Sequence, residues 1–446
     1  MAFTNKEMKD ASQIAYFSIL DKAQNFLQSD GGKGPYTVGE LLLYMVDEEA
    51  AKARFAEETG KDPSEATTRD ILMHSDLPED DIARVEHLSD ASLDWKVLDV
   101  YNMNPENGFY ACSLAKNDQD AIVAFRGSEN MHNVHNLVQD WMKADFGLLN
   151  STKTEQQAEA EKYADELVQG GLLDNYQNIG VTGHSLGGNL ASHFTIACAE
   201  NGREDLFNKI TQCDNLDGPG FSEKYLLEHE DAIAKADDKI THYKWSAVGD
   251  LLNDLPEEKV QFLDIDHEKY KDDPIARLRY LAIRRHDTRS LVFDEEGKAK
   301  EGKQDIVSKA LGSFSRVVDK NMPVMLVTTV INAGYKFVSK FLTTDERGII
   351  VPKNPFEKPG ENEHQGILGK IGTFVKDTVN IVREGVENVA DALTRGQFIP
   401  LPKFEEATQL AMADGNVRTS GLQDFTNEVS KDLSRNTQTQ TMEAEK

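Results

Sequence analysis

A short glycine-rich run between a predicted strand and a predicted helix constrains this chain more than any other feature. The run is Gly183-His184-Ser185-Leu186-Gly187-Gly188. The apolar stretch Ile179–Thr182 before it favours a strand, and the small and apolar residues Leu186–Glu200 after it favour a helix. G-x-S-x-G is a weak signal alone, but a strand entering and a helix leaving is the context it needs. The motif predicts a sharp turn that presents Ser185 at the carboxyl edge of a sheet.

The chain around this turn alternates between strand and helix patterns. The strand patterns are Trp95–Tyr101, Gly108–Ala115, Ala121–Phe125, Ile179–Thr182, Ile210–Asp214 and Ile240–Ser246. The helix patterns are Thr154–Gln169, Leu186–Glu200 and Phe221–Glu228. Such alternation is typical of an α/β fold, with a mostly parallel sheet and helices on both faces.

The two ends of the chain have a different pattern from this central part. Residues 1–90 are acidic and favour helices, with apolar residues at helical spacing in Ser12–Leu27 and a capping-box pair at Thr37 and Glu40. Strand signals stop after about residue 300, and apolar residues in Ile371–Leu393 recur every three or four positions. We predict an α/β domain with a helical N-terminal part in residues 1–300, and a helical C-terminal region in residues 301–446.

The charge of the chain is strongly negative and unevenly spread. It has 49 Lys and Arg against 77 Asp and Glu, a net charge of -28. This balance argues against a nucleic-acid partner, because phosphate contacts need a basic surface. Residues 301–446 hold 18 basic and 20 acidic residues, so residues 1–300 hold 31 and 57. The excess negative charge therefore belongs to the predicted α/β domain.

Within the C-terminal region, Lys303–Lys340 is basic and apolar, with six Lys or Arg and two Asp. A basic amphipathic helix is one interpretation, and such a helix lies on anionic membrane surfaces. A helical hairpin that packs on the α/β domain or on a partner protein is the other. We favour the hairpin.

Cysteines and apolar segments bear on the compartment. Cys112, Cys198 and Cys213 are too few for a disulfide framework and lack C-x-x-C spacing. The N-terminus has no signal-peptide pattern, and the longest uncharged apolar stretch, Asn321–Tyr335, has 15 residues, too few to span a bilayer. We expect a protein that is cytoplasmic or secreted without a cleaved leader, and not transmembrane.

A nucleophilic serine needs a histidine as base and a carboxylate that orients the base. In strand–elbow–helix enzymes their chain order is serine, acid, histidine. Asp250 follows the strand Ile240–Ser246, and His286 follows in R-R-H-D-T-R. We therefore predict the triad Ser185, Asp250 and His286. Asp217 and Asp254 also fit the acid position, and His242 and His267 also fit the base position.

The same chemistry needs an oxyanion hole, a pair of donors facing the negative charge that develops on the substrate. The backbone N–H of Leu186, next after the serine, is one expected donor. Ser128 is the second, because it follows the buried strand Ala121–Phe125 in a glycine turn. Gly183, His184 and Gly187 complete the predicted nucleophile elbow.

No metal or other cofactor is expected. His132 and His135 form H-x-x-H, which is weak evidence without a carboxylate at ligand spacing. Asp264, Asp266 and Glu268 cluster, but not with the spacing of a calcium-binding loop. No glycine-rich phosphate loop is present in the sequence.

The runs I-V-A-F-R-G-S, Asp140-Trp141 and V-T-G-H-S-L-G-G-N-L-A together resemble the class 3 lipase group of α/β-hydrolases. The resemblance covers about residues 90–290. The N-terminal runs S-Q-I-A-Y-F and Y-T-V-G-E-L-L resemble an uncharacterised bacterial family of lipase-like proteins. The resemblance implies an α/β-hydrolase fold and the triad named above. It also places Ser128 where these lipases usually have threonine, and a lid in Ser128–Asp140. This lid segment is polar here, which favours a smaller or more polar ester.

The expected function is hydrolysis of lipid esters, of the lipase or phospholipase A type. An acidic catalytic domain joined to a nearly neutral helical region is compatible with a lipid substrate. One alternative is a secreted lipase toxin or effector, because the layout resembles lipase toxins exported by the type VII route. Another is a catalytically silent binding module on the same fold. Acyl transfer and peptide hydrolysis use the same elbow and are not separated from ester hydrolysis by sequence.

Overall fold

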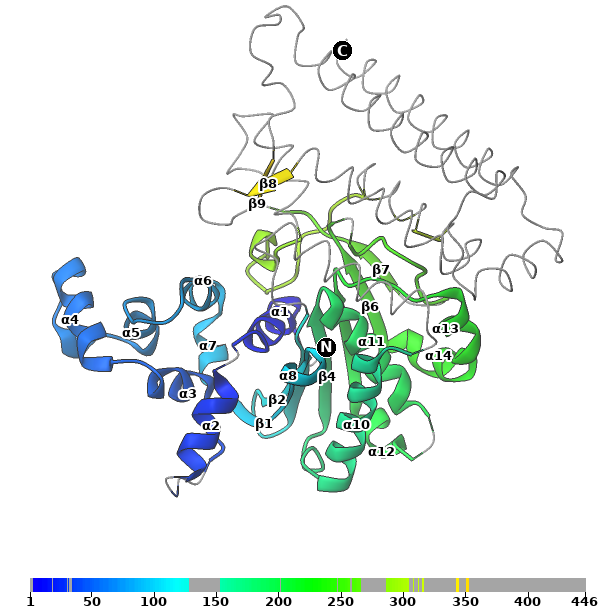
Figure 1. Ribbon diagram of the computed structural model, residues 1–446, viewed down its shortest axis with the longest axis horizontal. Coiled ribbons are helices and arrows are strands. Elements are labelled where there is room, and N and C mark those ends of the chain that lie inside the picture. The colour runs from blue at the N-terminus through cyan, green and yellow to red at the C-terminus, as the bar shows by residue number, and fades with distance from the viewer. Residues whose placement is uncertain are drawn as a thin grey trace, which may run out of the picture. The chain divides into compact units, whose positions relative to one another are not determined.

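The computed structural model describes residues 3–127 and 153–304, apart from gaps at residues 18, 30, 32–33, 201, 247, 257–258 and 266–285. Beyond these ranges it describes positions 308, 312, 315–316, 342–344 and 350–352. The chain divides into two compact units, residues 1–129 with 146–313 and residues 130–145 with 314–446. The first unit holds the main sheet and every helix named below (Figure 1).

The centre of the first unit is a seven-stranded sheet whose strands lie side by side in the order of the sequence. The first three strands pair antiparallel, and every later pair is parallel. The predicted α/β fold with a mostly parallel sheet is therefore confirmed. The strands are β1 (Lys96–Met103), β2 (Phe109–Ala115), β3 (Asp120–Phe125), β4 (Asn178–His184), β5 (Ile210–Leu216), β6 (Ile240–Lys244) and β7 (Lys259–Phe262).

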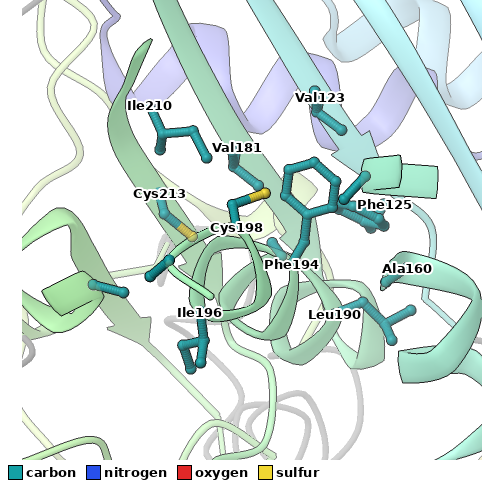
Figure 2. Packing of buried hydrophobic residues seen from close by; sticks show 14 of the residues in the cluster. Val123, Phe125, Ala160, Val181, Leu190, Phe194, Ile196, Cys198, Ile210 and Cys213 are labelled. Carbon is teal, nitrogen blue, oxygen red and sulfur yellow. The ribbon is translucent and has the colours of Figure 1, made fainter. Parts of the chain in front are cut away.

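The sequential strand order brings the crossover helices to one face of the sheet. Right-handed crossovers that always step in the same direction keep their helices on the same side. Side chains of the crossover segments share one buried cluster with residues of β2 to β6. At its centre, the rings of Phe125 and Phe194 lie 5.2 Å apart (Figure 2). These helices are α10 (Glu155–Gly170), α11 (Leu186–Cys198), α12 (Glu204–Lys209), α13 (Glu223–Glu228) and α14 (Glu230–Ala236).

The opposite face is covered by the N-terminal segment. Side chains of α1 (Asn5–Ile14) share a second buried cluster with Ile122 and Ala124 of β3. Met8 is fully buried, and its sulfur would lie 3.0 Å from a Cβ placed on Gly180 of β4. Helices thus cover both faces, as predicted, but those on the second face come from the start of the chain (Figure 1).

The helical spacing of apolar residues in Ser12–Leu27 predicts one helix there, but the structure has parts of two, so this prediction is wrong. Helix α1 begins earlier, at a capping box in which Thr4 and Glu7 bond each other's backbone N–H. It ends at Ile14, and α2 (Leu20–Ser29) follows. Phe17, between them, is buried in the same cluster as both helices, so the apolar spacing continues across the break. The predicted capping box of Thr37 and Glu40 is confirmed at the start of α3 (Val38–Tyr44).

The rest of the N-terminal segment is helical, as predicted, and is joined to α1 by buried polar contacts. Nζ of Lys9 lies 2.9 Å from Oδ1 of Asp10 and donates to the carbonyl oxygen of His87. Oδ2 of Asp10 accepts the N–H of Ser89 at 2.9 Å. The elements of this part are α4 (Glu48–Thr59), η1 (Pro63–Glu65), α5 (Thr68–Met73), α6 (Glu79–His87) and α7 (Asp90–Leu93).

In the second unit, the described residues include an antiparallel pair of strands, β8 (Leu342–Thr344) and β9 (Ile350–Pro352). The sequence predicted no strand after residue 300, and three residues are too few to produce a recognisable period. The expected helix over Ile371–Leu393 lies outside the described residues. The short elements of the first unit are α8 (Asn104–Asn107), η2 (Asp237–Lys239) and η4 (Thr288–Ser290).

The structure bears on two expectations from the sequence, the absence of a membrane-spanning helix and the absence of disulfides. No helix in the described part of the chain is long and apolar enough to cross a membrane. The three cysteines are buried thiols outside any disulfide, and Cys198 and Cys213 belong to the cluster between the sheet and the crossover helices (Figure 2).

Candidate active site

Ser185 sits in the turn between β4 and α11 with a backbone conformation that L-residues rarely adopt. Its φ is 60° and its ψ is -134°. A non-glycine residue held there costs about 1–3 kcal/mol, and such strain is typical of functional sites. The turn is held by two backbone hydrogen bonds, from Ser185 N–H to Leu216 O at 3.0 Å and from Gly188 N–H to Ser185 O at 2.8 Å.

Two glycines make this turn possible because the backbone approaches them too closely for a side chain. A Cβ on Gly183 would lie 2.1 Å from the carbonyl oxygen of Gly187. A Cβ on Gly187 would lie 2.3 Å from the carbonyl oxygen of Phe125, at the end of β3. The elbow is therefore packed against the neighbouring strand, and both positions exclude any larger residue.

His286 is brought to the same edge of the sheet and is bonded to Asp217. Nδ1 of His286 lies 2.7 Å from Oδ2 of Asp217. The second carboxylate oxygen, Oδ1, accepts the backbone N–H groups of Trp245 and Ser246, both at 3.0 Å. Asp217 follows β5, the strand next to β4, and is fully buried.

The electrostatics of this pair fix where the histidine proton lies. Burial alone would raise the pKa of Asp217, but the hydrogen bonds from His286, Ser246 and Trp245 lower that pKa to about 2. The carboxylate is therefore ionised near neutral pH and can only accept, so Nδ1 of His286 carries the proton. In the neutral ring Nε2 is then the lone-pair nitrogen, and it is buried with no hydrogen-bond partner among the described residues. This is the state that a general base requires.

The predicted role of Asp250 is corrected by this geometry. Oδ1 of Asp250 accepts from Nε2 of Gln304 at 2.9 Å and lies 3.7 Å from Nζ of Lys244. Burial raises the pKa of Asp250. The acid at the histidine is instead Asp217, which the sequence pattern also allows. Since β5 pairs directly with β4, the carboxylate that ends β5 lies nearer the elbow than one in the loop after β6.

Asp254 and His242, which the sequence also allows as acid and base, belong to a separate cluster with Lys244, in which Asp254 is partly exposed. Asp254 lies 2.6 Å from Nζ of Lys244 and 3.2 Å from Nδ1 of His242. Nε2 of His242 donates to the carbonyl oxygen of Gly218 at 2.7 Å. His267, the remaining candidate base, lies outside the described residues.

His184, inside the elbow, holds the loop that carries His286. Its Nε2 lies 2.7 Å from the carbonyl oxygen of His286, and the two ring centroids are 4.5 Å apart. On another side the ring stacks on Trp245 at 5.9 Å. Burial, with the neighbouring His286, lowers the pKa of His184 to about 3, so the ring is neutral near pH 7. No local pattern in the sequence indicates this contact between His184 and the His286 backbone.

One half of the predicted oxyanion hole falls within the described residues. Leu186 is the first residue of α11, where backbone N–H groups have no partner inside the helix. Gly127, after β3, lies against the elbow, and a Cβ there would be 3.0 Å from Cβ of Ser185. Ser128 and the lid segment Ser128–Asp140 lie outside the described residues.

The weak metal candidates do not gain support. Within the described ranges, no group of three or more His, Cys, Asp or Glu is arranged to hold a metal ion. Asp264 is paired with Lys300 at 2.7 Å. His132, His135, Asp266 and Glu268 lie outside the described residues.

Comparison with known proteins finds one family model and several solved structures. Residues 88–268 match the family model described as Mbeg1-like. The solved structure of M37 lipase is similar at 15% identity, covering 73% of this chain and 95% of that one, with a TM-score of 0.31. The search of curated proteins found no match.

Two fungal lipases are also among the similar structures. The lipase from Rhizopus microsporus var. chinensis is 13% identical over 46% of this chain and 76% of its own, with a TM-score of 0.28. Lipase II from Rhizopus niveus is 15% identical over 43% of this chain and 79% of its own, with a TM-score of 0.29. The Mbeg1-like match contains Ser185 and Asp217 but ends before His286, and it begins after α1.

Proposed function

We propose that this protein is a serine carboxyl-ester hydrolase in which Ser185 is the nucleophile, His286 the base and Asp217 the orienting acid. The observation that carries the proposal is the buried Nε2 of His286, which has no hydrogen-bond partner among the described residues, while its Nδ1 is held by an ionised, fully buried Asp217. Ser185 supports it with the strained backbone conformation of a nucleophile elbow.

The reaction follows from these roles. Oγ of Ser185 attacks the ester carbonyl while its proton moves to Nε2 of His286, and Asp217 stabilises the imidazolium that forms. The N–H of Leu186, with Ser128 as the second donor, receives the oxyanion of the tetrahedral intermediate. Collapse expels the alcohol, which takes the proton from His286. Water then attacks the acyl-enzyme by the same route and releases the acid.

The proposed substrate is a lipid ester of the lipase or phospholipase A type. Support comes from the resemblance of the strand–turn run Ile122–Ser128 and the elbow run Val181–Ala191 to class 3 lipases. The polar segment Ser128–Asp140 favours a smaller or more polar ester. The C-terminal region, residues 301–446, remains the predicted site for a membrane surface or a helical partner.

The test is ester hydrolysis by the purified full chain. Wild-type protein should cleave short p-nitrophenyl esters, and Ser185→Ala should lose about 10⁴-fold or more in kcat. A fluorophosphonate should add covalently to Ser185 of the wild type only, as read by intact mass. Profiling of extracted lipids after treatment with each protein then identifies the substrate class. A wild type that neither hydrolyses esters nor takes the label would be a silent binding module instead.

A further inference from the structure

The N-terminal helical segment contributes one side chain to the elbow itself. Tyr16 follows α1, and its Oη lies 3.3 Å from Nδ1 of His184 and 3.5 Å from the carbonyl oxygen of His184. A Cβ on Gly127 would lie 2.7 Å from this Oη. The hydroxyl therefore sits between the elbow and the end of β3, beside the loop that leads to Ser128.

The direction of each hydrogen bond around His184 follows from what its partners can do. The carbonyl oxygen of His286 only accepts, so Nε2 of His184 must carry the proton of that 2.7 Å bond. A neutral imidazole has one N–H, so Nδ1 is a lone pair. Desolvation by burial raises the pKa of Tyr16 to about 12, so its hydroxyl keeps a proton to donate. Tyr16 can therefore donate to Nδ1 at 3.3 Å, the nearer of its two acceptors, since the carbonyl oxygen of His184 lies 3.5 Å away.

This donation selects one of the two neutral forms of His184. In the other form the proton is on Nδ1, and the lone pair of Nε2 would face the carbonyl oxygen of His286. The repulsion would release the backbone that places the His286 ring. Since Nδ1 of His286 is already bonded to Asp217, a shift of that backbone would change where Nε2 points.

We infer that Tyr16 is a positioning residue for the base, acting through His184 on the backbone of His286. The inference rests on the proposed function, because it assigns Tyr16 a part in the same hydrolysis. It gives the N-terminal segment a role in the reaction in addition to covering the sheet.

The ring of Tyr16 is fixed independently of its hydroxyl. The guanidinium of Arg84 lies 5.3 Å from the ring centroid, and Nη1 of Arg84 is bonded to Asp81 at 2.8 Å. Tyr16→Phe therefore keeps the ring packing and removes the hydroxyl, with its contacts to His184 and to the Gly127 backbone. Tyr101→Phe is the matched control, because Oη of Tyr101 donates to Oε2 of Glu159 at 3.0 Å, in a contact between β1 and α10.

The experiment compares both variants with the full-length wild type in ester hydrolysis and thermal unfolding. Tyr16→Phe should lower kcat about five- to tenfold with KM unchanged, the size expected for one hydrogen bond. Tyr101→Phe should leave kcat unchanged, and the two variants should have similar Tm values. In a His184→Phe background, the effect of Tyr16→Phe should disappear, because the residue through which it acts is gone.

The nitrogen-15 spectrum of histidine-labelled protein reports the ring directly. The His184 signals, identified by their loss in His184→Phe, should show a protonated Nε2 in the wild type and a larger Nδ1-protonated population in Tyr16→Phe. An unchanged kcat in Tyr16→Phe, or an equal loss in both backgrounds, would overturn the positioning role alone. A wild type without hydrolysis or fluorophosphonate labelling would overturn the proposed function, and this role with it.

Discussion

Nδ1 of His286 and Oδ2 of Asp217 lie 2.7 Å apart although 69 residues separate them in the chain. Asp217 has a φ of 54°, and its N–H donates to the carbonyl oxygen of Tyr243 at 2.7 Å. The carboxylate is thus held rigidly at the end of β5, where it can fix the orientation and proton position of the histidine.

The first prediction separates Asp217 from Asp250. Asp217→Asn should lower kcat for ester hydrolysis about 10⁴-fold, because an amide at this place no longer favours the Nδ1-protonated histidine. Asp250→Asn should change kcat less than about tenfold, since Asp250 is bonded to Gln304 rather than to His286. Steady-state kinetics of the two variants, with circular dichroism to establish folding, measure this. Equal losses in the two variants would contradict the assignment of the acid.

The second prediction concerns the elbow glycines. Gly183→Ala should destabilise the protein by about 3 kcal/mol or more, because its Cβ would lie 2.1 Å from the carbonyl oxygen of Gly187. Gly170→Ala is the control, since a Cβ there meets nothing within 4 Å and the residue ends α10. This control should be neutral or stabilising by about 0.5–1 kcal/mol. Urea unfolding of both variants gives the comparison, and similar midpoints would refute the steric argument.

The third prediction is a dependence of stability on pH at Asp214, in β5. Burial raises the pKa of Asp214 to about 7, although Gln212 and Asn5 donate to its carboxylate. A carboxyl group whose pKa is higher in the folded than in the unfolded state costs stability as it ionises. This cost is absent below pH 4, grows as pH rises to about 7 and is constant above that.

Asp214→Asn removes this ionisation and keeps the shape of the protonated acid. Its advantage over the wild type should grow from near zero at pH 4 to on the order of 4 kcal/mol at pH 8, since each pKa unit is worth about 1.4 kcal/mol. Urea unfolding of both proteins at pH 4.5, 6 and 8 measures the difference. A difference that does not vary with pH would show that Asp214 titrates normally.

The fourth prediction concerns the packing of α1 on the sheet. Met8→Ala should cost about 2–5 kcal/mol in the free energy of unfolding, because the fully buried side chain lies against Gly180 and leaves a cavity. Met45→Ala, the same change at a partly buried position, should cost clearly less. Chemical unfolding followed by tryptophan fluorescence compares them. Equal costs would mean that α1 is not an integral layer of the domain.

Much of the fold and the elbow could be predicted from local patterns. The strand and helix that flank Ser185 follow from residue type and spacing, and the capping box of Thr37 and Glu40 is visible in four residues. Local sequence patterns could not decide between Asp217 and Asp250 as the acid. Both aspartates follow a strand, and only the sequential order of β4, β5 and β6 places the first of them beside His286.

Tyr16 could not be found from the sequence for the same reason. It is 168 residues from His184, and nothing in S-Q-I-A-Y-F marks the tyrosine as a donor to a distant histidine. Helices on both faces were predicted, but not that the N-terminal segment supplies the second layer, because helical spacing shows that α1 has an apolar face but not what that face covers. Long-range placement depends on sheet order, and no short pattern records it.

Helix α1 covers strands that are synthesised much later, and this has a consequence for how the chain folds during synthesis. Helix α1 leaves the ribosome before the strands that it covers, because β3 begins only at Asp120 and β4 at Asn178. Asn5 accepts a hydrogen bond from the N–H of Ala299, a closure over 294 residues. The apolar face of α1 therefore lacks its sheet until β4 is complete at His184, and the Asn5 contact until Ala299 has been made. We expect slow folding limited by this last closure, and protection of the waiting helix by chaperones in the cell.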